Sequence, residues 1–175
     1  FPSIFHLGAM DWMPNAAGIK WILDTVWMKI QETNPQLNLY LAGRNMPQWL
    51  LDFKMQNVII EGEVADAQKF INSKSIMLVP LSSGGGMRVK IIEGMALGKT
   101  IISTAIGAEG IDYENGKNIL IANTEKEFID AINKCVSNQS FSENIGKNAR
   151  LLVEQKYDNK KICTELSDFY KTLLN

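Results

Sequence analysis

Short apolar runs alternate with longer amphipathic segments along the chain. Several of these runs are apolar without alternation, as in strands that are covered on both faces. Between the first two runs, Ile19, Leu23 and Ile30 belong to a series with helical spacing, which is entered through Pro14 and closed before Pro35. The pattern predicts alternating strands and helices, and therefore a parallel sheet. The predicted strands are residues 4–7, 37–42, 58–60, 76–81, 100–104 and 119–122.

Helical signals fill the segments between and after these strands. Thr124 and Glu127 have the spacing of a capping box, which indicates the start of a helix. Two helical segments then follow without a strand, and the second has an apolar face that needs a packing partner. The further predicted helices are residues 65–72, 89–97, 125–136, 142–155 and 159–174, the last with Ile162, Leu166, Phe169 and Leu173 on one face.

This order of elements fits a parallel sheet of about six strands with helices on both faces. The 175 residues are the size of one domain and contain no internal repeat, low-complexity tract or linker. We therefore expect residues 1–175 to form one doubly wound α/β domain. The chain enters a strand almost directly after Phe1, which suits a domain taken from a longer protein as well as simple removal of an initiator Met or a tag.

Charge and cysteine content narrow the class of protein. The 18 Lys and Arg residues nearly balance the 19 Asp and Glu residues, so we expect no nucleic-acid partner and only a local anion site. Cys135 and Cys163 lie in predicted helices without metal-ligand spacing, which indicates core residues in a reducing compartment. No apolar run approaches the ~20 residues that span a bilayer, and the chain does not open on a signal pattern. We expect a cytoplasmic location.

The strongest candidate for chemistry is a glycine loop between a predicted strand and a predicted helix. Ligands of open parallel sheets bind beyond the carboxyl ends of the strands, so the loops that follow strands matter most. Gly84, Gly85 and Gly86, followed by Met87, let the backbone approach a ligand closely. The helix start that comes next offers free N–H groups and a positive dipole end. This arrangement predicts a phosphate site.

Charged residues follow the glycine loop directly. Arg88 and Lys90 add cationic donors, and Arg88 can engage phosphate oxygens in a bidentate manner. Glu93 stands about one turn further into the helix, where its carboxylate can accept hydrogen bonds from ribose or sugar hydroxyls. The alternative is a flexible turn with solvated side chains, and we disfavour it because the glycines, the helix start and both cations coincide.

Two regular nucleotide-binding motifs come close without fitting. The segment 94–100 resembles a Walker A loop, but it has one residue too few between its glycines and leads from a helix into a strand. Gly98 fits a helix C-cap better. Gly84 and Gly86 begin a dinucleotide fingerprint whose third glycine is missing, in a loop that follows a late strand. We therefore expect neither a P-loop nor an NAD site.

Residues after the other strands are weaker candidates. Gly8 and Ala9 follow the first strand and can bring bare backbone to the same ligand, although packing of the loop by Trp12 explains the segment equally well. Arg44 follows a strand end and can either reach a phosphate or be solvated. His6 is the only histidine, and we expect a core or edge residue rather than a catalytic one. No Asp-x-Asp pair is present to hold a divalent ion against a diphosphate.

Together these motifs resemble the C-terminal, donor-binding domain of the retaining GT-B glycosyltransferases of group 1, also called family 4. The similarity runs essentially from end to end and is most specific between Gly86 and Gly110. It rests on Gly86-Met87-Arg88-Val89-Lys90-Ile91-Ile92-Glu93-Gly94-Met95-Ala96-Leu97-Gly98-Lys99, Ser103-Thr104 and Gly107-Ala108-Glu109-Gly110, with weaker matches at Phe5-His6-Leu7-Gly8 with Trp12 and Pro14-Asn15, Leu41-Ala42-Gly43 and Glu61-Gly62-Glu63-Val64.

The resemblance implies that the ligand is a nucleoside diphosphate sugar. Glu93 would match the second glutamate of the family's E-x7-E element and bind the ribose. Arg88 and Lys90 would face the diphosphate and assist its departure. Gly8 would lie beside the diphosphate, and backbone near Val64 would meet the base.

The chain departs from the family pattern at two places. The first glutamate of the element, which contacts the donor sugar in relatives, would fall at Gly85. The Arg and Lys pair that often follows the first strand is replaced by residues 12–15, Trp-Met-Pro-Asn. Arg88 and Lys90 would then carry the phosphate contacts alone.

The mechanism that the resemblance implies is hexosyl transfer with retention, without a metal or another cofactor. Fixed cations and dipoles would stabilise the departing diphosphate. The acceptor, a saccharide or a lipid-linked saccharide, would bind a preceding N-terminal domain that this chain lacks. The last helix would pack on that domain, which could also bring the protein to the inner face of the membrane, and the domain alone would be inactive.

Alternatives from other classes stay open. A sugar-nucleotide epimerase of similar fold is the enzymatic alternative, and a regulatory module that only binds a nucleotide is the non-enzymatic one. A structural domain whose glycine loop binds nothing is the third. Analysis of reaction products separates a transferase from an epimerase, and calorimetry with nucleoside diphosphates tests for the structural domain.

Overall fold

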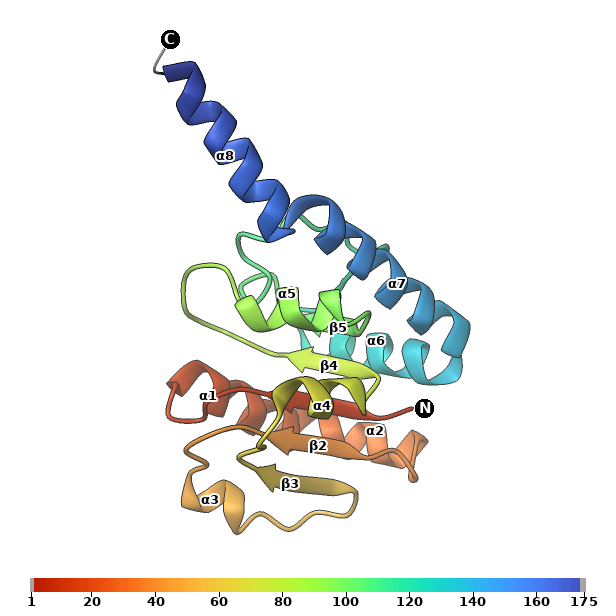
Figure 1. Ribbon diagram of the computed structural model, residues 1–175. Helices are drawn as coiled ribbons and strands as arrows, with labels where there is room; N and C mark the ends of the chain where they lie inside the picture. The colour runs from red at the N-terminus through yellow and green to blue at the C-terminus, as the bar shows by residue number, and fades with distance from the viewer. Residues whose placement is uncertain (1, 174–175) are drawn as a thin grey trace.

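A six-stranded parallel sheet organises residues 2–173, the part of the chain that the computed structural model describes (Figure 1). The strand order is β3-β2-β1-β4-β5-β6. The order reverses between β1 and β4, so the sheet is doubly wound and has its switch point there. The predicted fold class is confirmed. The strands are β1 Ile4–Leu7, β2 Leu39–Ala42, β3 Val58–Gly62, β4 Ile76–Val79, β5 Thr100–Ser103 and β6 Leu120–Ile121.

The central strands end level with one another. Leu7 pairs with Ala42 of β2, and Val79 of β4 pairs with Ser103 of β5. The strand predicted at 76–81 ends early because Pro80 has no backbone N–H for the ladder. The loops that leave these strands therefore start from one edge of the sheet, which positions the candidate site.

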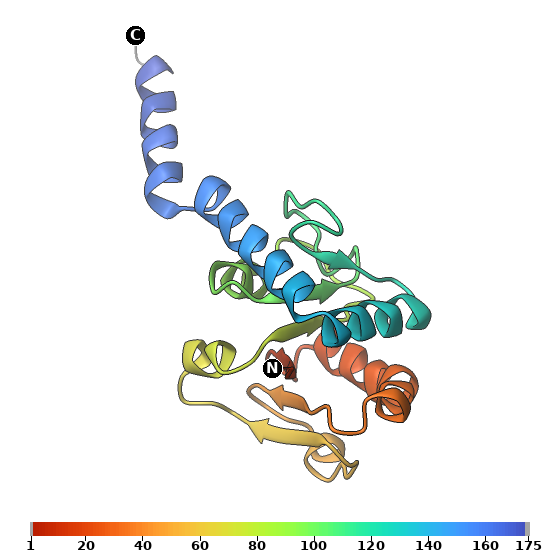
Figure 2. The same ribbon diagram turned by 90° about the vertical axis from the view of Figure 1, so that its right-hand side faces the viewer.

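Helices cover both faces of the sheet (Figure 2). On one face lies a continuous helical stretch of α1 Met13–Trp21, the π-helical turns η1 Ile22–Trp27 and α2 Met28–Thr33, together with α6 Glu125–Ser137. On the other face lie α4 Ala67–Asn72, α5 Val89–Ala96 and α7 Gln139–Lys156. Each face has its own apolar core, with Trp27 and Phe128 in the first and Phe5 and Phe70 in the second.

Most helix boundaries follow the sequence signals. The capping box is present, since the Thr124 side chain accepts from the backbone of Glu127 and the Glu127 carboxylate accepts from the backbone of Thr124. The helix predicted from residue 65 begins at Ala67 instead, because the Asp66 side chain caps it by accepting from Lys69 N at 2.9 Å. A short helix that the pattern did not predict, α3 Gln48–Leu51, follows β2.

The last helix, α8 Asn159–Leu173, extends away from the rest of the molecule (Figures 1 and 2). None of its residues is buried, and its apolar residues Ile162, Leu166, Phe169 and Leu173 are exposed. Leu174, the end of the predicted helix, lies outside the described residues. None of the helices formed by residues 2–173 is long and apolar enough to cross a membrane.

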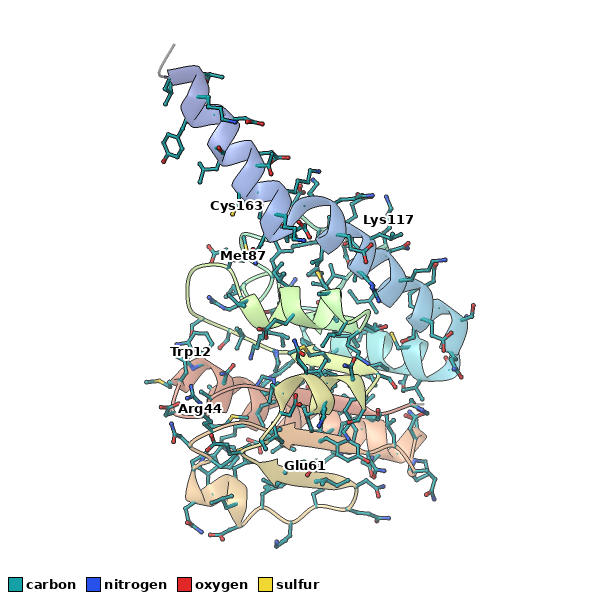
Figure 3. All side chains as sticks on the ribbon, viewed as in Figure 1. Trp12, Arg44, Glu61, Met87, Lys117 and Cys163 are labelled. Atoms are coloured by element: carbon teal, nitrogen blue, oxygen red, sulfur yellow. The ribbon has the colours of Figure 1, made fainter. Side chains whose placement is uncertain are left out.

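The expectation that both cysteines are core residues is half wrong. Cys135 of α6 is buried in the first core, whereas Cys163 is exposed on α8 (Figure 3). Cys163 does lie in a helix, as predicted, but no residue of α8 is buried by a neighbour within residues 2–173.

Candidate functional site

A cavity of about 240 Å³ opens where β1, β2 and β3 end. Four of the predicted ligand-binding residues line it, namely Gly8, Ala9, Arg44 and Val64. The parallel strands bring them together because each residue follows the carboxyl end of its strand. Figure 3 shows Arg44 at the edge toward which the strand arrows of Figure 1 point. The remaining lining residues are Leu7, Gly43, Glu63 and Ala67.

Gly8 leaves space at the floor of this cavity for two side chains. A Cβ atom at Gly8 would lie 2.6 Å from Asn15 Nδ2 and 3.0 Å from Lys90 Nζ. Asn15 belongs to the first turn of α1 and Lys90 to the first turn of α5, so both reach this point from different helices. The bare backbone of Gly8, which lines the cavity, thus lets a cation from α5 approach it closely.

The ammonium of Lys90 is held by two oxygen atoms. Its Nζ donates to Asn15 Oδ1 at 2.7 Å and to the Leu7 carbonyl at 3.3 Å. Burial, and secondarily the positive charge of Arg88, lowers the pKa of Lys90 from 10.5 to about 7. A bound anion would favour the charged form and raise this pKa again. The site therefore contains a cation that is poorly solvated and has no carboxylate among its hydrogen-bond partners.

Arg88 organises the glycine loop that follows β4. Its Nη1 donates to the carbonyl of Gly85 and, at 2.6 Å, to the carbonyl of Gly86. The guanidinium also lies over the Trp12 ring at 5.1 Å from its centroid. Gly84 and Gly86 have φ angles of 105° and 84°, which glycine adopts without strain. The loop is therefore closed on the Arg88 side chain.

Arg88 is nine-tenths buried in this arrangement, with 9% of its surface exposed. Its Nε and Nη2 atoms are buried without a hydrogen-bond partner within residues 2–173. Buried guanidinium N–H groups normally have acceptors. A phosphate contact by Arg88 would require rotation of the side chain away from Trp12 and the loop carbonyls.

The other predicted residues on this side are exposed. Gly84, Gly85, Gly86 and Met87 form the outer part of the loop, and Figure 3 shows Met87 at the same edge as Trp12. They do not line the 240 Å³ cavity.

The first turn of α5 continues the predicted phosphate site. Its N-cap is Arg88, which makes no side-chain capping hydrogen bond. The Ile91 N–H already donates to the Arg88 carbonyl at 2.9 Å, so the N–H groups of this turn that are open to an acceptor are those of Val89 and Lys90. Glu93, on the same helix, is exposed, and the described part of the chain supplies no partner for its carboxylate. Its predicted contact with ribose remains a prediction.

His6 is a core residue, as predicted. It is fully buried in β1, and its Nδ1 donates to the Leu78 carbonyl at 2.8 Å. Burial lowers the pKa of His6 well below 6.5, and the nearby positive charge of Lys90 lowers it further. The ring is neutral at physiological pH, so it does not compete with Lys90 for an anion.

Other cavities lie outside this cluster, and two of them are larger than the 240 Å³ cavity. One of about 370 Å³ is lined by Trp21, Leu81, Ser82, Ile106 and Asn123, together with neighbouring residues of α1 and the loops after β4 and β5. A larger one of about 450 Å³ lies beside β3 and the segment after α3, away from the glycine loop. Among residues 2–173, no three His, Cys, Asp or Glu side chains gather in a way that could hold a metal ion.

Sequence reasoning missed two members of the cluster. Asn15 is named in the sequence only among residues 12–15, which replace the family's cation pair, and its burial can be seen only in the structure. Trp12 is predicted to pack its loop, and no sequence signal shows that its ring faces the Arg88 guanidinium. Both contacts join segments far apart in the sequence.

The family comparison matches residues 1–138 to the glycosyl transferases group 1. The chain belongs to this family. Among curated relatives, the chain is 25% identical over 173 residues to an uncharacterized 44.6 kDa protein in the cps region of Klebsiella pneumoniae, a match that covers 94% of this chain and 45% of that protein. It is 30% identical over 120 residues to the capsular polysaccharide biosynthesis glycosyltransferase CapM of Staphylococcus aureus, covering 67% of this chain and 31% of CapM. The chain thus spans less than half the length of these two relatives.

Solved structures share the fold of this group 1 chain. The C-terminal domain of the Francisella tularensis group 1 protein LpcC has a TM-score of 0.70 at 18% identity, covering 90% of this chain and 87% of that chain. Anabaena HepE in complex with UDP has a TM-score of 0.72 at 18% identity, and the match covers 95% of this chain and 48% of HepE. S. aureus TarM, in a complex with UDP, Fondaparinux and alpha-GlcNAc-glycerol, has a TM-score of 0.79 at 19% identity, and the match covers 95% of this chain and 34% of TarM. The architecture is therefore that of a group 1 C-terminal domain.

Proposed function

We propose that this chain is the donor-binding domain of a glycosyltransferase that transfers a sugar from a nucleoside diphosphate sugar with retention and without a metal ion. The single observation that carries the proposal is the half-buried ammonium of Lys90 beside the bare backbone of Gly8, which itself lines the cavity. This combination suits a diphosphate, because a cation and backbone N–H groups in a poorly solvated site bind anions strongly.

Different residues in and near the cavity would bind different parts of the donor. Val64 and Ala67 offer apolar surface to a base, and Arg44 stands at the rim. Glu93 accepts hydrogen bonds from the ribose hydroxyls in this proposal. The UDP complexes of HepE and TarM support a nucleoside diphosphate as the ligand class.

The transfer itself breaks the bond between the anomeric carbon and the diphosphate oxygen. The diphosphate leaves with the electron pair, and the acceptor oxygen forms its bond on the same face of the sugar. Negative charge grows on the leaving group in the transition state, so donors that already point at it lower the barrier. In this chain those donors are Lys90, the first turn of α5 and, after rotation, Arg88.

The acceptor site belongs to the part of the protein that precedes this domain. Its acceptor is a saccharide, free or lipid-linked, in line with the capsular polysaccharide role of CapM. The exposed apolar face of α8 would pack on that preceding part, because apolar helix faces are stable when covered. This domain alone would bind the donor without transferring the sugar.

Isothermal titration calorimetry of this chain tests the proposal directly. UDP and GDP, together with uridine and guanosine, are titrated with and without EDTA. At least one diphosphate should bind, and its affinity should survive EDTA. Absence of heat from all nucleoside diphosphates at millimolar concentration would contradict the proposal and favour a structural domain.

The longer protein that contains this domain is then incubated with the donor whose nucleotide binds. Appearance of a new glycoside with retained anomeric configuration supports transfer. An isomerised free donor would show an epimerase instead, and binding without turnover of any donor would favour a regulatory module.

A further inference from the structure

Asn15 is a buried polar residue, and one of its two side-chain hydrogen bonds goes to a residue of another segment, Lys90. The Asn15 side chain is 4% exposed and uses both ends of the amide. The Nδ2 donates to the Ala9 carbonyl at 2.8 Å, and the Oδ1 accepts from Lys90 Nζ at 2.7 Å. The orientation of the amide is unambiguous, because a carbonyl can only accept and an ammonium can only donate.

The amide joins two elements on either side of the switch point of the sheet. Asn15 stands in α1, which follows β1, and Lys90 stands in α5, which follows β4. Lysine is a flexible side chain, and on a helix start it would ordinarily point into solvent. The pair Asn15 Oδ1 and Leu7 O fixes two of its N–H groups. The third N–H has no acceptor in the described chain.

The choice of an amide rather than a carboxylate has a chemical consequence. An Asp at this place would neutralise Lys90 and leave little charge for a ligand, whereas the Asn oxygen accepts a hydrogen bond and leaves the positive charge intact. The charged or titratable groups that act on Lys90 are Arg88, which is positive, and His6, which is neutral because burial lowers its pKa well below 6.5. Neither of them compensates the ammonium.

We infer that Asn15 is a positioning residue, which fixes the Lys90 ammonium under Gly8 and leaves one of its N–H groups for the diphosphate of the bound nucleotide. The inference rests on the proposed function. Asn15 itself touches Lys90 and the Ala9 carbonyl, and it acts on the ligand only through Lys90.

Two substitutions separate positioning from a purely structural role. Asn15→Leu keeps the approximate size and removes both hydrogen bonds, and Asn15→Asp keeps the size and adds a negative charge. Asn118→Leu is the matched control, because Asn118 is also 4% exposed and its Oδ1 accepts from Glu114 N, away from Lys90. Unfolding in urea checks that each variant is folded.

Calorimetry with UDP and with uridine, from pH 6 to 9 at constant ionic strength, gives the first readout. At pH 6, Asn15→Leu should weaken UDP binding about tenfold or more and leave uridine binding unchanged, because only UDP offers a phosphate to Lys90. Asn118→Leu should change neither. An equal loss for UDP and uridine in Asn15→Leu, or the same UDP loss in Asn118→Leu, would overturn the inference.

The pH midpoint of Lys90 protonation gives a second readout, and it would not change if Asn15 had only a structural role. This midpoint is measured by NMR of the isotope-labelled Lys90 side chain in the ligand-free chain. A carboxylate beside the ammonium favours its charged form, so Asn15→Asp should raise the midpoint by about one pH unit or more. An unchanged midpoint in folded Asn15→Asp would show that residue 15 does not hold the ammonium.

The two readouts also keep this inference separate from the proposed function. If the unmodified chain binds no nucleoside diphosphate, the proposed function fails, and the role assigned to Asn15 toward a ligand fails with it. The Lys90 midpoint still decides whether Asn15 holds the ammonium. If the unmodified chain binds UDP and only the Asn15 results disagree, the proposed function stands and Asn15 is a structural residue.

Discussion

The surroundings of Lys90 destabilise its charged form, so replacing Lys90 tests whether the charge serves to bind a ligand. Lys90→Met retains the approximate length of the side chain and removes the amine. Burial, with the charge of Arg88, lowers the pKa from 10.5 to about 7. One pKa unit corresponds to ~1.4 kcal/mol, so holding the charged amine costs the fold on the order of 5 kcal/mol. The variant avoids this cost but also loses the hydrogen bond to Asn15, which lowers its stability by ~1–3 kcal/mol. We expect Lys90→Met to be more stable than the parent by about 2–4 kcal/mol near pH 7.

The pH dependence of this difference identifies its cause. Below the folded pKa of about 7 the amine is charged in both states, and the cost to the fold is fully present. Between pH 7 and 10.5 the folded amine is neutral while the unfolded chain still binds the proton, so the stability of the parent rises with pH. The stability difference should therefore move against Lys90→Met by ~1.4 kcal/mol per pH unit, so the advantage of the variant shrinks and then reverses within this range. His6 does not interfere, because its pKa lies well below 6.5.

Urea unfolding of the parent and of Lys90→Met at several pH values from 7 to 10 provides the measurement. A variant that is less stable than the parent near pH 7, or a difference that does not change with pH, would refute the argument. UDP binding is measured on the same samples and should weaken by ~1–3 kcal/mol in Lys90→Met, while uridine binding stays unchanged. Lys99→Met is the matched control, because burial also lowers the pKa of Lys99, yet its Nζ donates to the carbonyls of Asn72 and Lys74 at the other end of the strands.

Three further outcomes are expected in the same calorimetric assay. Glu93→Ala should weaken binding of nucleoside diphosphates by ~1–3 kcal/mol with little effect on unfolding, and an unchanged affinity would remove Glu93 from the site. Arg88→Ala should lose UDP affinity while Arg88→Lys recovers only part of it, since only Arg forms the planar fork; full recovery by Lys would point to a simple charge effect. EDTA should leave UDP binding intact and added salt should weaken it through screening, whereas loss of binding in EDTA would require a metal ion.

The fold could be predicted from the sequence because its central strands, β1, β4 and β5, are covered on both faces. Each of the six strands overlaps a predicted apolar run, although β3 continues past residue 60 to Gly62, and the helix starts at Thr124 and after the glycine loop carry local signals. Errors occurred where tertiary context outweighs local pattern. The run 76–81 is apolar throughout, yet β4 ends at Val79 before Pro80. The four-residue helix α3 is too short to show a period.

The site could be predicted only in outline. Gly8, Arg44 and Val64 converge because residues that follow parallel strands share one edge, and that rule can be applied to the sequence alone. The conformation of Arg88 cannot be obtained in this way. Its guanidinium bonds the loop carbonyls of Gly85 and Gly86, and the choice between these acceptors and a phosphate depends on the geometry of the loop.

Lys90 lies next to Asn15 in space although the two residues are far apart in the sequence. The resemblance to the family indicated that a cation pair is missing after the first strand, where Asn15 stands. The structure brings a cation to that same place from α5, since Lys90 Nζ lies 2.7 Å from Asn15 Oδ1 although the two residues are 75 positions apart. The fold allows this because β1 and β4 are neighbours, so the helices that follow them begin on either side of one crevice. A residue type that is missing from one loop can therefore be supplied across the switch point, and a motif search along a single segment would miss it.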